Sequence, residues 1–501
     1  MKKKASKQTQ MNNFYICNDL LHSHNEPKVF LFLKKCLTNG LFFVFLHFII
    51  LRTRNTNALK NKVYIETYGC QMNFADSEIV GAILTKEGYG IVSDINEADF
   101  ILINTCAIRD NAEQRIRKRL RELKALQRQR QWVKIGILGC MAERLQKQLM
   151  EEEDNVSFIV GPDAYRKLPE MLGHIQDGEK LAETLLSEVE TYADIEPVRY
   201  DSNGITAYIS IMRGCQNYCA YCVVPYTRGR ERSRDPKTIV SEARSLVEKG
   251  YREVTLLGQN VNSYRWKSES EFVGFPQLMA MVAEVSPLLR VRFATSHPKD
   301  LSDELLQVMA RYDNICKCIH LPVQSGSERM LKLMNRRYTP EWYLNRIDAI
   351  RKYLPTCSIT TDVIAGFCSE TEEDHQATLE MFRKVRYDYA YMFKFSMRPN
   401  TYAAKHLQDD TPDDVKTRRL EEIIALQGEI ALENNQKEIG KTYEVLIEGV
   451  SHRSEQQLFG RNSQNKVIVF DRGSLEPGQY AMVRVTRCTS ATLIGEVVDN
   501  N

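Results

Sequence analysis

The stretch Arg213-Gly-Cys-Gln-Asn-Tyr-Cys-Ala-Tyr-Cys222 places Cys215, Cys219 and Cys222 in a C-x3-C-x2-C pattern. Three thiolates at this spacing can hold three corners of a cubane iron–sulfur cluster, and the fourth iron then receives no ligand from the motif. An open iron can bind a substrate or cosubstrate, which a closed four-cysteine electron-transfer site cannot. Zinc sites usually close at four ligands by pairing C-x2-C with a second, distant pair. The sequence has no such pair, so the pattern favours the cluster over a zinc knuckle.

The composition limits the classes of protein that the chain can belong to. Its 501 residues are long for one core and predict two to four domains. The hydrophobic content of 43% and charged content of 27% are ordinary for a soluble globular protein. The net charge of +3 is nearly neutral, so a nucleic-acid partner has to meet local basic patches. The 13 scattered cysteines argue against a secreted disulfide framework and for the reducing cytoplasm.

Residues 1–60 differ from the rest of the chain. Lys2–Lys4 open the sequence, and an apolar run follows at Leu41–Leu51. The run is shorter than the roughly 20 residues that a membrane helix needs. Arg52 and Arg54 follow it in place of a small-residue cleavage site. We therefore expect residues 1–60 to be a poorly structured extension with no membrane partner, and a tethering helix is the minority alternative.

From Lys62 onward, a strand-like run that ends at a cysteine occurs three times. The runs are Lys62–Cys70, Asp99–Cys106 and Val133–Cys140, spaced by roughly 35 residues, about one βα unit. Apolar strands alternating with helical patterns imply a parallel sheet, whose ligands lie beyond the carboxyl ends of the strands. We therefore expect an N-terminal α/β domain over residues 61–178, with a second three-thiolate cluster at these cysteines. Buried structural cysteines are the alternative.

A second α/β series follows an acidic, linker-like stretch at residues 181–196. Its six strand candidates are Ala207–Met212, Glu253–Leu257, Arg290–Ala294, Lys317–Leu321, Ser358–Ile364 and Tyr391–Phe395. Six βα units predict an open, partial (βα)6 barrel over residues 201–432, with its chemistry at the carboxyl ends of the strands. Polar residues fall there, among them Gln259, Ser296 and Asp362. One such residue is more often a loop cap, but their repetition at successive strand ends favours a ligand pocket.

The last part of the chain, residues 435–498, predicts five short strands with turn signals between them. This pattern suits a small, OB-like β-barrel. Basic residues decorate it: Arg453, Arg461, Lys466, Arg472, Arg484 and Arg487. A second basic run comprises Arg228, Arg230, Arg232 and Arg234, and a third lies on a predicted helix at residues 111–130. Dense basic runs in a nearly neutral protein indicate a polyanionic substrate such as RNA, with a merely solvated surface as the alternative.

Together these parts resemble the methylthiotransferase family over nearly all of Lys62–Val498. Members join a three-cysteine N-terminal domain, a radical S-adenosylmethionine (SAM) core and a C-terminal β-barrel called TRAM. The matching motifs are Tyr68-Gly-Cys-Gln-Met-Asn73, Asn104-Thr-Cys-Ala-Ile-Arg109, Leu257-Gly-Gln-Asn-Val-Asn262, His320-Leu-Pro-Val-Gln-Ser-Gly326 and Met334-Asn-Arg-Arg-Tyr-Thr339. Two positions depart from the pattern: Cys368 replaces a common proline, and Asn400 a common glycine. Asn tolerates left-handed backbone angles, so the turn at Arg398–Thr401 should survive.

The resemblance implies an α/β radical SAM enzyme with two [4Fe-4S] clusters and two equivalents of SAM. One SAM would be the radical source and the other the methyl donor, and an electron donor such as flavodoxin or ferredoxin is implied. By the same resemblance, Tyr221, Gln259, Ser296 and Asp362 line the SAM pocket. Protein acid–base groups cannot realistically remove the hydrogen at C2 of an adenine ring, whereas a carbon radical can.

The resemblance also implies a substrate. The pattern Cys70-Gln-Met-Asn73 is typical of the subgroup that modifies tRNA carrying N6-(dimethylallyl)adenosine at position 37, next to the anticodon. Sister families act on threonylcarbamoyl-adenosine in tRNA or on an aspartate of a ribosomal protein. A non-catalytic iron–sulfur RNA-binding protein is a further alternative, and it would not cleave SAM when reduced.

Overall fold

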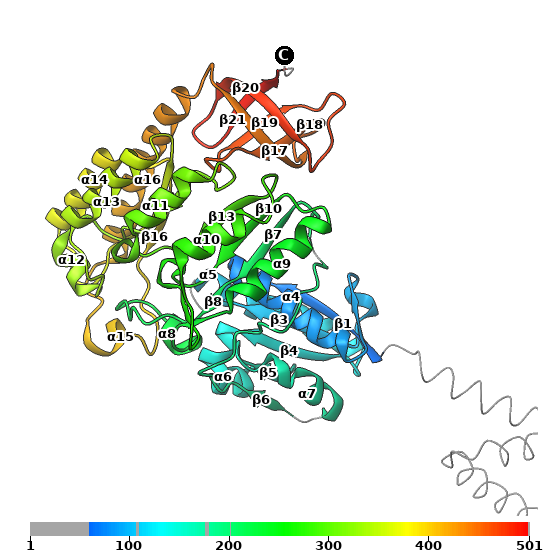
Figure 1. Cartoon of the computed structure of the whole chain (residues 1–501). Helices are drawn as coiled ribbons and strands as arrows, with labels where there is room; N and C mark the ends of the chain where they lie inside the picture. Colours follow the sequence, from blue (N-terminus) through cyan, green and yellow to red (C-terminus); the bar gives the residue numbers. More distant parts are fainter. Residues whose placement is uncertain (1–59, 107–109, 176–179, 201, 499–501) are drawn as a thin grey trace, which may run out of the picture. The chain divides into compact units, whose positions relative to one another are not determined.

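The structure is a computed structural model that describes residues 60–106, 110–175, 180–200 and 202–498 (Figure 1). Nearly all of the extension expected at residues 1–60, including the apolar run Leu41–Leu51, lies outside the described residues. Contacts between residues divide the chain into two units, Met1–Lys60 and Asn61–Asn501. No helix in the described ranges combines the length and the apolar character that a bilayer crossing requires.

The N-terminal domain is built on a six-stranded sheet in the order β2-β1-β3-β4-β5-β6. The strands are β1 (Lys60–Thr67), β2 (Tyr89–Val92), β3 (Phe100–Thr105), β4 (Lys134–Gly139), β5 (Val156–Val160) and β6 (Leu181–Glu183). All neighbours from β1 to β6 pair in parallel. Every residue of β3 is buried, because helices cover both faces of the sheet.

The helices of this domain divide between the two faces. They are α4 (Gln71–Lys86), α5 (Asp110–Gln129), α6 (Cys140–Glu152) and α7 (Leu168–His174), with short 3-10 turns η1 (Ile95–Glu97) and η2 (Tyr165–Lys167). One apolar cluster joins the sheet to α4 and α7, and a second joins it to α5 and α6. The predicted parallel α/β domain with alternating helices is therefore confirmed.

Two three-stranded parallel sheets form the centre of the molecule. They are β7 (Thr206–Ser210), β10 (Glu253–Leu257) and β13 (Arg290–Ala294), then β14 (Cys318–His320), β15 (Ser358–Ala365) and β16 (Tyr389–Lys394). A parallel bridge between Val291 and Ile315 connects the two sheets. The six strands thus form the open, partial barrel that the sequence predicts, and one large apolar cluster fills the space between strands and helices.

Helices and short elements surround these strands (Figure 1). The helices are α8 (Val224–Thr227), α9 (Pro236–Glu248), α10 (Phe275–Ala283), α11 (Asp303–Arg311), α12 (Glu328–Leu333), α13 (Pro340–Tyr353), α14 (Glu372–Val385), α15 (Tyr402–His406) and α16 (Asp413–Gln436). The short elements are β8 (Met212–Arg213), β9 (Arg232–Ser233), β11 (Arg265–Lys267), β12 (Phe272–Gly274), η3 (Val261–Ser263) and η4 (Pro298–Asp300). Asn400 has a φ of 68°, and Thr401 Oγ1 donates to the Arg398 carbonyl at 2.7 Å. The expected turn is therefore present.

The C-terminal part is a closed barrel in the strand order β17-β18-β19-β21-β20. Its strands are β17 (Thr442–Ser451), β18 (Ser454–Arg461), β19 (Val467–Asp471), β20 (Tyr480–Cys488) and β21 (Leu493–Val497), which confirms the predicted five-stranded barrel. The barrel packs where β13 and β14 begin. Arg290 Nη1 donates to the Arg461 carbonyl at 2.6 Å, and Lys317 N donates to Ser463 Oγ at 2.9 Å. It therefore contacts the amino ends of core strands, whereas the predicted pocket residues follow their carboxyl ends.

Candidate functional site

Three cysteines meet at the carboxyl edge of the N-terminal sheet. Cys106 follows β3 directly, Cys140 follows β4, and Cys70 precedes α4. Cys106 and Cys140 are 3% and 4% exposed. Hydrogen bonding with Cys106 lowers the pKa of the Cys70 thiol to about 6, and the charge of Arg228 acts in the same direction. The structure thus brings together the three thiols that the sequence predicts as ligands.

Local packing explains why Cys70 can approach Cys106. Gly69 has a φ of +120°, and a Cβ at this position would overlap the Cβ of Cys106. Only glycine accommodates both constraints. Asn104, in β3, donates from Nδ2 to the Asn73 carbonyl and to Ser77 Oγ, each at 2.9 Å. These bonds tie the first turns of α4 to β3, so the cysteines that precede and follow these elements are held in place.

The other three cysteines lie in the loop between β8 and α8. The Cys215 N–H donates to the Gly229 carbonyl at 3.1 Å, and the Cys222 N–H donates to the Cys219 carbonyl at 2.9 Å. Arg336 Nη1 donates to Cys219 Sγ at 3.3 Å. Burial raises the pKa of Cys215 to about 11 and also raises that of Cys222. Cys215 and Cys222 therefore ionise only beside strong positive charge, which a bound metal supplies.

Polar atoms without partners mark the ends of the core strands. Gln259 Oε1, Ser296 Oγ and Gln324 Oε1 are buried and have no hydrogen-bond partner in the described part of the chain. Gln259 follows β10, Ser296 follows β13, and Gln324 bridges to Val363 in β15. Buried polar atoms are normally paired, so a polar ligand such as SAM fits this position. Sequence reasoning assigned Gln259 and Ser296 to the SAM pocket, and it counted Gln324 among the polar residues at strand ends without assigning it to SAM.

The two remaining predicted pocket residues have protein partners. Asp362, in β15, places Oδ1 at 3.4 Å from His320 Nε2. The Tyr221 ring packs edge to face against Phe367, with 6.4 Å between ring centroids. Asp362 lies within β15, three residues before that strand ends, and Tyr221 lies next to Cys222 in the cysteine loop.

A buried ion-pair network joins the N-terminal domain to the cysteine loop of the core. Asp76, on α4, is fully buried and accepts hydrogen bonds from Arg213 Nη1 at 2.7 Å and Arg228 Nη2 at 2.8 Å. Asp163 accepts from Arg232 Nη1 at 2.7 Å. Burial alone would raise the pKa of Asp76, but Arg213 and Arg228 hold it below its ordinary value. The two cysteine sites are therefore connected through paired charges.

This network corrects one expectation from the sequence. Arg228, Arg232 and Arg234 are buried, at 3%, 6% and 6% exposure, and each pairs with a carboxylate. The prediction that this run contacts RNA is wrong at these three positions, because a buried and paired guanidinium cannot reach a phosphate. Arg230 is exposed, so the predicted RNA contact still applies to this residue.

The other basic segments are partly neutralised. On α5, Arg117 pairs with Glu152 at 2.8 Å and Lys124 pairs with Asp154 at 3.1 Å. The exposed basic residues of that helix are Arg115, Lys118, Arg121 and Arg128. On the barrel, Arg472 pairs with Glu476 at 2.7 Å. The field available to a polyanion is therefore weaker than the count of basic residues indicates.

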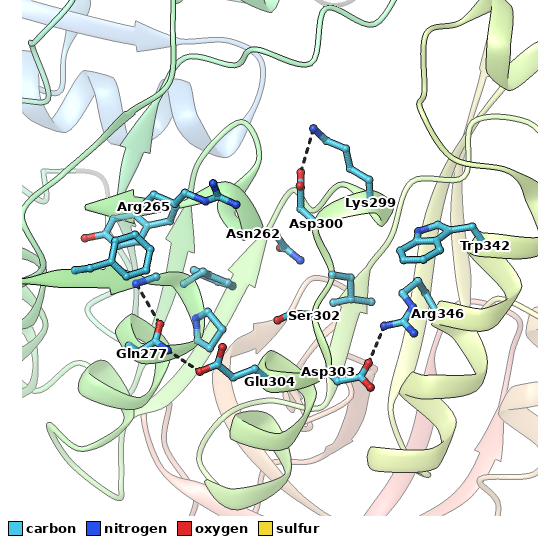
Figure 2. A pocket seen from close by; sticks show the side chains of 16 residues that line it. Asn262, Arg265, Gln277, Lys299, Asp300, Ser302, Asp303, Glu304, Trp342 and Arg346 are labelled. Atoms are coloured by element: carbon cyan, nitrogen blue, oxygen red, sulfur yellow. Dashed lines mark hydrogen bonds and ion pairs between the residues drawn. The ribbon is translucent and has the colours of Figure 1, made fainter. Parts of the chain in front are cut away.

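A cavity of about 550 Å³ is lined by residues from the segments that follow β10 and β13, and Figure 2 shows the side chains that line it. Asn262, from the Leu257–Asn262 motif, lines it, and neither polar atom of its side chain has a partner in the described ranges. Opposite charges on its wall pair with each other: Arg346 with Asp303 at 2.7 Å, and Lys299 with Asp300 at 3.7 Å. The cavity thus contains the unpaired Asn262 amide, whereas Gln259, Ser296 and Gln324 are not among the residues that line it.

Three family models match the chain. The model described as uncharacterized protein family UPF0004 matches residues 62–161, the radical SAM superfamily matches 209–382, and the TRAM domain matches 436–498. The radical SAM methyltransferase TsrM from Kitasatospora setae covers 66% of this chain and 73% of its own, with a TM-score of 0.50 and 14% identity. At that identity the likeness concerns the fold alone. The class is therefore an α/β radical SAM protein with a TRAM domain.

Curated relatives narrow this class. A tRNA-2-methylthio-N(6)-dimethylallyladenosine synthase from Bacteroides thetaiotaomicron is 57% identical over 87% of this chain and 96% of its own length. Enzymes with the same name from Porphyromonas gingivalis and Amoebophilus asiaticus are 53% and 54% identical, covering 88% of this chain and 96% and 93% of their own lengths. The chain belongs to the tRNA-2-methylthio-N(6)-dimethylallyladenosine synthase family.

Proposed function

We propose that this protein is a tRNA methylthiotransferase that adds sulfur and a methyl group at C2 of N6-(dimethylallyl)adenosine at position 37, next to the anticodon. The observation that carries this proposal is that one chain contains two separate sets of three cysteines, and that the buried hydrogen bonds of Asp76 connect the two sites. Family membership and the radical SAM match support the same activity. The domains we assign to it are residues 61–178, 201–432 and 435–498.

We further propose which residues hold the cofactors. Cys215, Cys219 and Cys222 would hold one [4Fe-4S] cluster, and the set at Cys70 would hold the second. When bound, the clusters and two equivalents of SAM supply the carbon radical, the sulfur and the methyl group that the protein lacks. Gln259, Ser296 and Gln324 would orient SAM through their unpaired polar atoms. Asp362 and Tyr221 would form more distant walls of that pocket.

The partners follow from this chemistry. A cluster that must be reduced requires an electron donor such as flavodoxin or ferredoxin, and a tRNA substrate places the enzyme in the cytoplasm. The TRAM barrel and the exposed basic residues of α5 would hold the tRNA backbone. Because the barrel contacts the amino ends of core strands, a tRNA that reaches the barrel and the strand-end pocket must extend along the core.

Nucleoside analysis tests the substrate. The chain is expressed in a bacterial host that lacks its own methylthio modification, and tRNA nucleosides are measured by mass spectrometry. The expected product is 2-methylthio-N6-(dimethylallyl)adenosine. Modification of threonylcarbamoyl-adenosine instead, or of a ribosomal protein, would assign the chain to a sister activity. SAM that stays intact under reduction would favour a non-catalytic RNA-binding protein.

Cysteine variants test the two-cluster assignment. Cys215→Ala should remove one cluster and abolish SAM cleavage, whereas Cys70→Ala should remove the other, spare cleavage and stop sulfur insertion. Two cubanes correspond to roughly eight irons per reconstituted chain. A wild-type content of only about four irons would contradict the assignment.

A further inference from the structure

Arg228 reaches from the core domain into the cysteine site of the N-terminal domain. Its Nε donates to Cys140 Sγ at 3.1 Å, and its Nη2 donates to Asp76 Oδ2 at 2.8 Å and to Asn73 Oδ1 at 3.2 Å. All three partners belong to the N-terminal domain, whereas Arg228 follows α8, six residues after Cys222. The N-terminal cysteine site is therefore completed by a side chain of the other domain.

One donor of this guanidinium remains unused. Arg228 is 3% exposed, and its Nη1 is buried without a partner in the described part of the chain. A buried N–H group normally has an acceptor. The Nε contact already points the guanidinium at the thiols, so sulfur or another anionic group at that site would supply the acceptor.

The charges of the buried network agree with this geometry. Arg213, Arg228 and Arg232 contribute three positive charges, while Asp76 and Asp163 contribute two negative ones. One positive charge is therefore not matched by a carboxylate within this network. Burying such a charge is unfavourable unless an anion balances it, and a cluster on three thiolates is anionic.

We propose that Arg228 is a positioning residue for the iron–sulfur cluster on Cys70, Cys106 and Cys140, and that its charge raises the reduction potential of that cluster. The proposal rests on the proposed function only in assuming a cluster at this site. Hydrogen bonds to the sulfurs and nearby charge set cluster potentials. A cation stabilises the reduced state, which is the more negative one, so the potential rises.

The test uses the full-length chain with Cys215, Cys219 and Cys222 changed to alanine, so that only the second cluster can be observed. Arg228→Gln and Arg228→Lys are introduced into this background and the chains are reconstituted. Iron content, electron paramagnetic resonance spectra and the midpoint potential are measured. Arg230→Gln, which removes an exposed charge two residues away, is the matched control.

Arg228→Gln should move the midpoint potential to a more negative value or lose the cluster, while Arg228→Lys should stay closer to the parent. Arg230→Gln should match the parent. Loss of iron with Gln but not with Lys also supports the proposal, provided that circular dichroism shows both chains folded. A Gln variant with full iron, unchanged spectra and an unchanged potential overturns it. If the parent background binds no iron, the two-cluster function fails instead, which is a separate result.

Discussion

Replacing Asp76 with asparagine should loosen the contact between the N-terminal domain and the core. Asp76→Asn keeps the shape of the side chain but removes the charge shared by Arg213 and Arg228, which are 1% and 3% exposed. Breaking a buried ion pair costs about 3–5 kcal/mol. Arg213 retains the Pro162 carbonyl at 2.9 Å and Arg228 retains Cys140 at 3.1 Å, so we expect the lower end of that range.

Hydrogen exchange measures this effect directly. A loss of about 3 kcal/mol corresponds to a roughly 100-fold increase in the open population, so amides of α4 should exchange about 100-fold faster. Glu97→Gln is the control, because Glu97 pairs with Lys62 at an exposed position, where ion pairs contribute little. If Asp76→Asn leaves α4 as protected as this control does, the buried network does not hold the domains together and the reasoning is refuted.

The same variant has a defined pH dependence. The native pKa of Asp76 lies below its ordinary value of 3.8, because Arg213 and Arg228 outweigh the effect of burial. Its stabilisation is therefore fully present above the ordinary pKa and is lost as the pH falls through the lowered native pKa. The stability difference between wild type and Asp76→Asn should narrow as the pH falls below about 3.8.

Three further predictions address other parts of the molecule. Gly214 has a φ of +79°, and an alanine methyl there would overlap the Arg230 carbonyl, so Gly214→Ala should lose the Cys215 cluster in iron analysis. The control is Gly250→Ala, at a position with a φ of +93° and open space, which should lose only about 1 kcal/mol of stability and keep its iron. Burial and the negative charges of Asp163 and Glu183 raise the pKa of Glu143 to about 8. The stabilising effect of Glu143→Gln should therefore grow as the pH rises from 4.5 to about 8 and then level off. A stabilising effect that does not change with pH in thermal denaturation would contradict this. Deleting residues 439–501 should weaken tRNA binding and flatten its salt dependence while SAM cleavage without tRNA persists; equal affinity across a salt series would remove the barrel from the binding model.

Sequence alone determined the features that depend on local spacing. The strand runs that end at Cys70, Cys106 and Cys140 indicated a parallel sheet with thiols at its carboxyl edge, because that edge follows from the order of strand and helix. The C-x3-C-x2-C run and the five terminal strands were equally readable, since each is contained in a short segment. The class of protein followed from these three features.

The tertiary structure decided which charges face solvent. The sequence predicts a basic surface at Arg228, Arg232 and Arg234. In the structure, Asp76 pairs with Arg228 and Asp163 pairs with Arg232, from 152 and 69 positions away. Likewise, Arg336 reaches Cys219 across 117 positions. Counting charges along the sequence does not reveal ion pairs between residues that come together only when the chain folds. The burial of a charged side chain depends on every element packed around it, whereas its residue type is given by the sequence. For that reason the contacts of both cysteine sites are visible only in the folded molecule.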